Sequence, residues 1–405
     1  MTKSNISVVE VKALEQALID RPDFLKNLVR ETLQEILEAE MTEHLGADKH
    51  ERSEQRTGQR NGYKPRTLNT RVGKMTLAIP QARDGSFSTE LFARYSRSEK
   101  ALVSSLMEMY LKGVSTRKVA DITEKLCGIS FSSSQVSTIT KGLDRQINAW
   151  KKRPLGCYPY LIVDARYEKV RTPRGVISQG VLITVGIRED GYREVIDVSM
   201  ADTESKTAYA ELFADLRARG LSDVKMVISD AHAGLKAAIA RYFQGAVWQR
   251  CQVHYIRDAC TKVAFGVRSC VVEDVRSIFA KSTLESAKAR AQFVADEYSL
   301  MYPKFSTFIE EHIEECLSVL AFPHAHQNRL RTNNTIERLN QEIKRRTAVI
   351  RIFPNEASAL RLIASLCIEV SEEWMCGKKY LNMKLLEDME EEKEEAKRAR
   401  LRKVS

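Results

Sequence analysis

Apolar residues recur at steps of three and four positions over two stretches in the first part of the chain. Residues 24–37 show this spacing, and so do residues 99–150. Because an α-helix has 3.6 residues per turn, the pattern predicts helices in both stretches. Between them, residues 75–80 alternate apolar and polar side chains and end in proline, which predicts a short strand.

Residues 114–145 carry the pattern of a helix-turn-helix. Ser133 or Ser134 would cap its second helix. The outer face of that helix would present Gln135 and Lys141, polar side chains of the kind that reach base edges in DNA. A plain helical hairpin is the alternative. The inner faces of the two helices would be formed by Val119, Ile122, Leu126, Val136, Ile139 and Leu143.

From residue 158 the pattern changes to strands. Three apolar stretches come first, and a turn signal at residues 189–191 joins the second to the third. A helix over residues 206–219 follows, and then two strand–helix units with strands near 224–229 and 246–250. The order β-β-β-α-β-α-β-α predicts a mixed α/β sheet with helices on its faces.

Residues 255–325 break this alternation, because their apolar residues keep helical spacing with no convincing strand. We interpret them as an all-helical insertion. After it, Asn333 or Asn334 would cap a helix whose buried stripe is Ile336, Leu339 and Ile343. The sequence therefore predicts six parts: a helical and basic region 1–98, the helix-turn-helix 99–150, the sheet 151–254, the insertion 255–325, a return to the sheet domain 326–375, and a charged helix or tail 376–405.

The composition is that of a basic, soluble chain. Its 405 residues include 64 Lys and Arg against 54 Asp and Glu, which gives a formal net charge of +10. No apolar run reaches the roughly 18 to 20 residues of a membrane helix, and the first residues do not form a secretory signal. We therefore expect a cytoplasmic protein with reduced cysteines and no membrane partner. The basic excess favours a polyanionic partner but does not identify one.

Residues 46–66 are rich in Arg, Lys and Gly and have almost no apolar side chains. Such a segment is either a solvated linker or an extended arm that follows DNA phosphates. In the second interpretation, Arg60, Lys64 and Arg66 would contact DNA.

Two aspartates stand where apolar strands end. Asp164 closes the apolar run that begins at residue 158, and Asp230 follows the strand near 224–229. Functional groups in open α/β sheets gather at the carboxyl ends of strands, so these carboxylates would lie side by side if their strands are neighbours. Such a pair repels itself unless a cation lies between, and Mg²⁺ suits hard oxygen ligands that face water.

Glu337 is the third candidate acid, on the polar side of the helix that begins near residue 334. Its neighbours are basic, so a simple ion pair is the alternative. Two metal ions held by a few carboxylates can activate a water or a 3′-hydroxyl and stabilise the leaving oxygen at phosphorus. The arginine at 338 would fit phosphate oxygens. The DNA-contacting face of this helix would comprise Arg338, Lys344, Arg345 and Arg346.

Four stretches carry a family resemblance: YPYLIVDARYEKVR, VKMVISDAHAGLKAAI, VWQRCQVHYIRDA and RTNNTIERLNQEIKRRTAVIRIFPNEASALRL. With them, about residues 30–385 resemble bacterial insertion-sequence transposases of the Mutator-like family. The resemblance implies a ribonuclease-H-like core with a DDE triad, interrupted by a helical insertion before the glutamate. Matched position by position, the triad falls on Asp164, Asp230 and Glu337. It also implies two Mg²⁺ or Mn²⁺ ions bound by these residues.

The resemblance further implies binding to the terminal inverted repeats of a mobile element and to target DNA, as a homodimer on paired ends, in the bacterial cytoplasm at the nucleoid. The family carries a Cys-x2-His signature, which matches Cys251 and His254 here. A second half of a zinc site is absent from the sequence. We expect the pair to line the active site, with a structural histidine as the alternative. His232 would either contact the scissile phosphate or cap the helix after Asp230.

Two other functions compete with a DDE-type transposase. A catalytically silent DNA-binding regulator derived from a transposase would keep the helix-turn-helix, but the intact acids argue against it. A metal-dependent nuclease would cut DNA without joining it.

Overall fold

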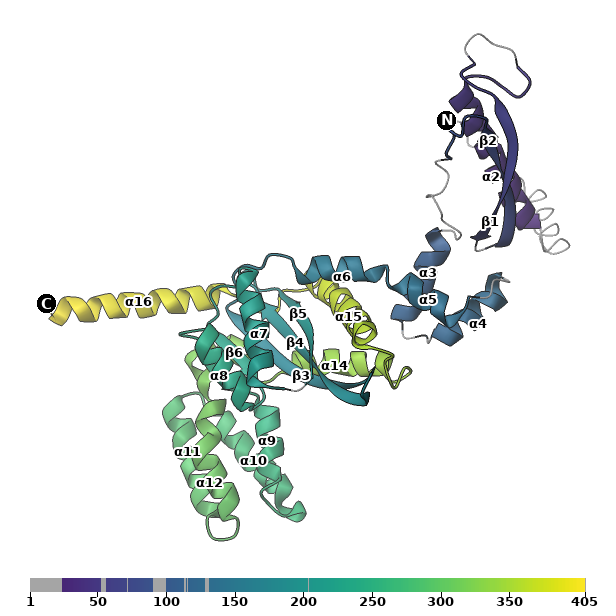
Figure 1. Ribbon diagram of the computed structural model, residues 1–405. Helices are drawn as coiled ribbons and strands as arrows, with labels where there is room; N and C mark the ends of the chain where they lie inside the picture. The colour runs from purple at the N-terminus through teal and green to yellow at the C-terminus, as the bar shows by residue number, and fades with distance from the viewer. Residues whose placement is uncertain are drawn as a thin grey trace, which may run out of the picture. The chain divides into compact units, whose positions relative to one another are not determined.

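The computed structural model describes residues 24–51, 56–70, 72–89, 100–112, 114, 116–127, 131–202 and 204–404 (Figure 1). The chain divides into two compact units, Met1–Lys141 and Gly142–Ser405. Within the described residues, none of the helices is both long and apolar enough to cross a membrane.

The first unit contains a helix that packs on a two-stranded sheet. Helix α2 (Phe24–Leu45) lies against the antiparallel strands β1 (Arg60–Thr70) and β2 (Gly73–Ala82). The strand predicted at 75–80 is confirmed. Strand β1 was not predicted, because most of its side chains are exposed and polar and so show no alternation. The buried contact between the layers is made by Leu37, Leu68, Met75 and Leu77.

Three helices of the first unit pack on one another: α3 (Lys100–Leu111), α4 (Thr116–Cys127) and α5 (Ser133–Thr140). Val119 and Val136 are buried between them and Ile139 packs against the same cluster, as predicted. The predicted cap at Ser133 or Ser134 is wrong by one or two positions, since Ser132 is the N-cap. The predicted second helix is also too long.

Helix α5 ends at Thr140, and α6 (Leu143–Lys151) belongs to the second unit. The break falls at Gly142, a residue that costs a helix interior about 1 kcal/mol relative to Ala. Leu143 is buried in α6 rather than on a continuation of α5. The side chain of Leu126, also predicted for the inner face, lies outside the described residues.

The second unit is built on a five-stranded mixed sheet with the order β5-β4-β3-β6-β7. Strands β3, β4 and β5 are antiparallel neighbours, and β6 and β7 run parallel to β3. The predicted order of strands and helices is confirmed. The bounds are β3 (Tyr160–Thr172), β4 (Gly175–Ile187), β5 (Arg193–Ala201), α7 (Lys206–Ala218), β6 (Met226–Ser229), α8 (Ala233–Tyr242), β7 (Val247–Arg250) and α9 (Gln252–Cys260).

Helices cover both faces of this sheet (Figure 1). Helices α7 and α8 pack on Leu161 and Val163 through an apolar face that includes Tyr209 and Phe213. Side chains alternate along a strand, so Asp164 points to the opposite face. There it meets α14 (Asn334–Thr347), while α15 (Glu356–Cys376) packs beside it.

Residues 255–325, all of which are described, hold helices and short 3-10 turns and no strand, as predicted. Helices α9 to α12 form a bundle of their own (Figure 1), and its core is centred on Tyr255, Val275 and Phe305. The elements that follow α9 are η1 (Phe265–Val267), α10 (Arg268–Phe279), α11 (Leu284–Tyr298), α12 (Pro303–His312), η2 (Ile313–Cys316), η3 (Ser318–Ala321), α13 (His324–Leu330) and, after α14 and α15, α16 (Lys384–Val404).

A buried ion pair fixes the end of α7 to the edge strand, and its loss should be costly. Arg219 donates to Asp197 at 3.2 Å, and their side chains are 7% and 2% exposed. Arg219→Met would leave the buried carboxylate without its hydrogen-bonded cation, with Lys151 as the remaining cation that acts on it. We therefore expect the free energy of unfolding to fall by about 3 to 5 kcal/mol, measured by urea unfolding. Asp215→Asn is the control, because Asp215 pairs with the same arginine but is 59% exposed. It should cost less than about 1 kcal/mol, and an equal loss for both variants would contradict the argument.

Candidate active site

The pairing register of two parallel strands brings Asp164 and Asp230 together. Ile162 of β3 lies opposite Ile228 of β6, and each aspartate comes two residues later. The strands are neighbours, as the sequence argument required. One detail differs from the prediction: Asp164 lies inside β3, which continues to Thr172, and only the apolar run ends there. Asp230 directly follows the last residue of β6.

Glu337 approaches the same site from α14. It lies in the first turn of that helix, whose stripe of Ile336, Leu339 and Ile343 is buried as predicted. One turn further on, Asn340 donates from Nδ2 to Asp164 Oδ2 at 2.9 Å. The helix is therefore tied to β3 at the aspartate itself.

The charges of the three predicted acids act on one another. The pKa of Asp164 is raised to about 7, first because burial removes the carboxylate from water and then because Asp230, Glu337 and Glu204 place negative charge near it. Asp230 remains open to solvent, with 51% of its side chain exposed. The structure thus gathers an acidic centre that a nearby cation would stabilise.

Glu204 is a fourth acid of this centre, and the sequence argument missed it. It lies between β5 and α7 and accepts a hydrogen bond from Tyr209 Oη at 2.9 Å. Because β5 runs antiparallel to β4 and β4 antiparallel to β3, β5 points the same way as β3. Applying the rule of strand ends to β5 would have identified Glu204 as well.

The donor atoms of this centre fit a divalent metal. They are carboxylate oxygens, the hard ligands that Mg²⁺ and Mn²⁺ accept while keeping several waters. Burial and the neighbouring negative charges both disfavour the ionised form of Asp164, and a bound dication would offset this cost. Within the described part of the chain, no three acidic, histidine or cysteine side chains already stand close enough together to hold a metal ion.

Cys251 lies between the second aspartate's strand and the helix of the glutamate. Its backbone N–H donates to the carbonyl of Ser229 at 2.8 Å, and its Sγ donates to Asn333 Oδ1 at 3.0 Å. The side chain is fully buried, and burial raises the pKa of the thiol. Asn333 is the N-cap residue of α14, so Cys251 connects β6 to the start of that helix.

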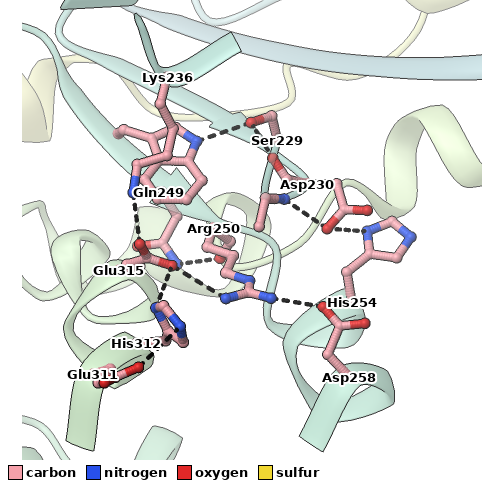
Figure 2. A network of polar contacts seen from close by, with 12 residues as sticks. Ser229, Asp230, Lys236, Gln249, Arg250, His254, Asp258, Glu311, His312 and Glu315 are labelled. Atoms are coloured by element: carbon pink, nitrogen blue, oxygen red, sulfur yellow. Dashed lines mark hydrogen bonds and ion pairs between the residues drawn. The ribbon is translucent and has the colours of Figure 1, made fainter. Parts of the chain in front are cut away.

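The two histidines lie near the acids but make few contacts. His254 Nδ1 is 4.0 Å from Asp230 Oδ1 (Figure 2). His232 occupies the N-cap position of α8, and its side chain makes no capping hydrogen bond there. Its ring instead lies 5.5 Å from the ring of Tyr209. Among the described residues, neither His254 Nδ1 nor His232 Nδ1 has a hydrogen-bond partner.

The basic residues of α14 that were predicted to contact DNA differ in solvent exposure and in whether an acid already pairs with them. Arg338 and Lys344 are exposed. Arg345 is exposed too, but it bonds twice to Glu342 and lowers the pKa of that carboxyl to about 2. Arg346 is buried and bonds to the same glutamate at 2.8 Å. Arg338 and Lys344 are therefore the better placed pair for phosphate.

The predicted contacts of the first unit show the same division. Lys64 and Lys141 are exposed and Arg66 is partly buried. Arg60 binds Glu38 at 2.7 Å and Thr42 at 2.8 Å, which ties β1 to α2. Gln135 accepts from the backbone N–H of Ser132 in a capping box. The arginine and the glutamine thus already serve the unit's own structure.

Known proteins resemble this chain along almost its whole length. The sequence matches the family described as "Transposase, Mutator family" over residues 1–377. It is 47% identical over 387 residues to the transposase for insertion sequence element ISRM5 of Rhizobium meliloti (strain 1021), which covers 95% of this chain and 96% of that protein.

Two further relatives are more distant. Identity is 40% over 368 residues with the transposase for insertion sequence element IS256 in transposon Tn4001 of Staphylococcus aureus, covering 89% of this chain and 94% of that protein. It is 36% over 389 residues with the transposase for insertion sequence element IS1081 of Mycobacterium tuberculosis, covering 95% and 94%.

The charge on Asp164 should make the metal-free protein less stable as the pH rises. Its pKa is about 7 in the folded chain against an ordinary 3.8, so the protonated form favours folding and that stability is lost between about pH 4 and pH 7. Asp164→Asn should therefore raise the free energy of unfolding near pH 8, by on the order of 2 to 4 kcal/mol, and change it little near pH 4. Urea unfolding in a chelator measures both values.

Asp121→Asn provides the matched control, since Asp121 is exposed on α4. It should leave the pH dependence of stability as in the wild type. If Asp164→Asn did not raise the free energy of unfolding near pH 8, the raised pKa of Asp164, from burial and from the neighbouring acids, would be wrong.

Proposed function

The chain belongs to the Mutator family of transposases, and we propose that it cuts and rejoins DNA at the terminal inverted repeats of an insertion sequence, with Asp164, Asp230 and Glu337 as its catalytic acids. The observation that carries this proposal is the register of β3 and β6, which brings the two aspartates side by side. The effect of Glu337 on the pKa of Asp164 supports its inclusion. A DDE-type enzyme needs these three acids at one centre.

The acids would hold two divalent ions, Mg²⁺ or Mn²⁺, and Glu204 adds negative charge to the same centre. When bound, such ions supply an activated water or 3′-hydroxyl and stabilise charge at phosphorus. The chain's own groups orient the acids. Asn340 fixes one oxygen of Asp164, and the backbone N–H of Ala231 donates to Asp230 Oδ1 at 2.7 Å. Partial burial of Asp164 lowers its contact with solvent and raises its pKa.

Several finer features belong to the same proposal. The strand order, with three antiparallel strands followed by two parallel ones, supports a ribonuclease-H-like core. The three-helix cluster of α3, α4 and α5 would recognise the element ends, and the exposed Arg338 and Lys344 would contact DNA near the cut. The enzyme would act as a homodimer on paired ends, on DNA of the bacterial cytoplasm.

Replacing any one of the three acids should stop the chemistry and spare DNA binding. Asp164→Asn, Asp230→Asn and Glu337→Gln would each remove a metal ligand, so we expect strand transfer to fall by at least about 100-fold. The assay uses labelled element ends, Mg²⁺ and a target plasmid, and a gel-shift measurement follows binding. Glu342→Gln is the matched control on the same helix, because Glu342 pairs with Arg345 and Arg346.

The products of the wild-type assay distinguish the competing functions. Joined ends support a transposase, cut ends without joining support a nuclease, and shifted but uncut DNA supports a silent regulator. Normal joining by the Asp164→Asn variant would disprove the catalytic assignment.

The basic face of α14 should contribute to DNA affinity through charge. Arg338→Ala removes an exposed guanidinium, so we expect weaker binding to all sequences. The negative slope of log affinity against log salt concentration should become shallower by about one. Titration of DNA at several salt concentrations measures the slope. Arg345→Ala should change it less, because Glu342 already neutralises Arg345. Equal slopes for Arg338→Ala and the wild type would exclude a phosphate contact.

A further inference from the structure

A buried arginine joins the sheet to the helical insertion. Arg250, the last residue of β7, has a side chain only 5% exposed. It binds Asp258 of α9 at 2.6 Å and Glu315 of η2 at 3.1 Å (Figure 2). Undocking the insertion would take both carboxylates away and leave the buried guanidinium without a counter-charge, so the contact favours this docking geometry.

The same glutamate extends the network to helix α8. Lys236 donates to Glu315 Oε1 at 2.6 Å. The ammonium of Lys236 also lies 4.4 Å from the ring centre of Trp248, a cation–π contact. Gln249 adds two bonds to the insertion, from Nε2 to the carbonyl of Cys316 at 2.9 Å and from the N–H of Val319 to its Oε1 at 2.8 Å.

This network reaches the acidic centre through one tryptophan and one serine. Trp248 Nε1 donates to Ser229 Oγ at 2.9 Å, and Ser229 Oγ donates to the carbonyl of Asp230 at 2.9 Å. The backbone N–H of His232 donates to that same carbonyl at 3.0 Å. The β-ladder between β6 and β7 ends at Ser229, so Asp230 is the first residue beyond it. The backbone carbonyl of Asp230 is therefore held by these local bonds and not by the ladder.

We propose that Trp248 and Ser229 are positioning residues that hold Asp230 in its metal-binding orientation and couple it to the docked helical insertion. The inference rests on the proposed function, because it takes Asp230 as a metal ligand. Ser229 is fully buried and its hydroxyl has both a donor and an acceptor partner. Packing of Trp248 alone would not require the indole N–H to face Ser229. Mutation of a residue that orients a metal ligand typically lowers metal affinity by about 10- to 100-fold.

The test compares Trp248→Phe and Ser229→Ala with the wild type. Each substitution removes one hydrogen bond and keeps most of the packing. We expect the Mn²⁺ concentration for half-saturation, measured by electron paramagnetic resonance of free Mn²⁺, to rise by about 10-fold. The Mg²⁺ concentration for half-maximal cleavage should rise in parallel, while cleavage at saturating metal stays near the wild-type rate. Trp374→Phe is the matched control. Trp374 of α15 stacks on Arg193 of β5 and takes no part in the network around Asp230.

Two more variants test the coupling to the insertion. Lys236→Met breaks the contacts to Glu315 and Trp248, and it should shift metal affinity in the same direction by a smaller factor. Arg290→Met breaks an ion pair of 2.9 Å to Asp274 inside the insertion. It should lower the thermal midpoint without changing Mn²⁺ affinity.

The outcomes separate this inference from the proposed function. Unchanged Mn²⁺ affinity in both Trp248→Phe and Ser229→Ala, with an active wild type, would overturn the positioning role. An equal shift in Arg290→Met would also overturn it, because general destabilisation would then explain the effect. If Asp230→Asn bound Mn²⁺ as tightly as the wild type, the metal-ligand assignment itself would fail.

Discussion

The repulsion between carboxylates on two neighbouring parallel strands is the constraint on which the second unit depends: Asp164 lies inside β3, where its apolar run ends, and Asp230 directly follows β6. Asp164 and Asp230 are held together by the register of β3 and β6, and α14 brings Glu337 to the same point. In water these groups would separate, since each ionised acid disfavours the others. Apolar packing on both faces of the sheet supplies the free energy that holds them in place. The strain is local, whereas the packing that opposes it is spread over the whole unit.

Much of this arrangement could be predicted because it follows from long apolar runs. Strands buried on both faces read as continuous hydrophobic stretches, and the acid that interrupts such a stretch is conspicuous. Asp164 and Asp230 were found in this way. The sequence pattern alone supports Glu337 less strongly, because a glutamate among arginines is usually an ion-pair partner. The family resemblance is needed to single it out. The stripe Ile336, Leu339 and Ile343 fixed the direction in which its helix faces.

The features that the sequence could not predict depend on contacts between elements or side chains that the local pattern does not show. Strand β1 is mostly exposed, so its pairing with β2 leaves no alternation in the sequence. Glu204 follows β5, and only the antiparallel chain of β3, β4 and β5 shows that its strand points toward the site. Arg346 resembles its basic neighbours in sequence, yet Glu342 lies one turn before it and holds it in a buried bond. Charge composition identifies a basic face but not which of its cations are already neutralised.

The opposed charges of α14 impose an order on binding. Glu337 faces an acidic centre, and the next residue, Arg338, is exposed among cations that would attract phosphate. A DNA phosphate drawn to that face would add negative charge beside Asp164, whose ionisation is already disfavoured. Without a cation between them, each approach of DNA would raise the pKa of Asp164 further and protonate the carboxylate that we propose as a metal ligand. Metal and DNA should therefore bind with positive coupling, each lowering the electrostatic cost of the other. The exposed cations of α14 and the acidic centre would therefore bind DNA and metal interdependently.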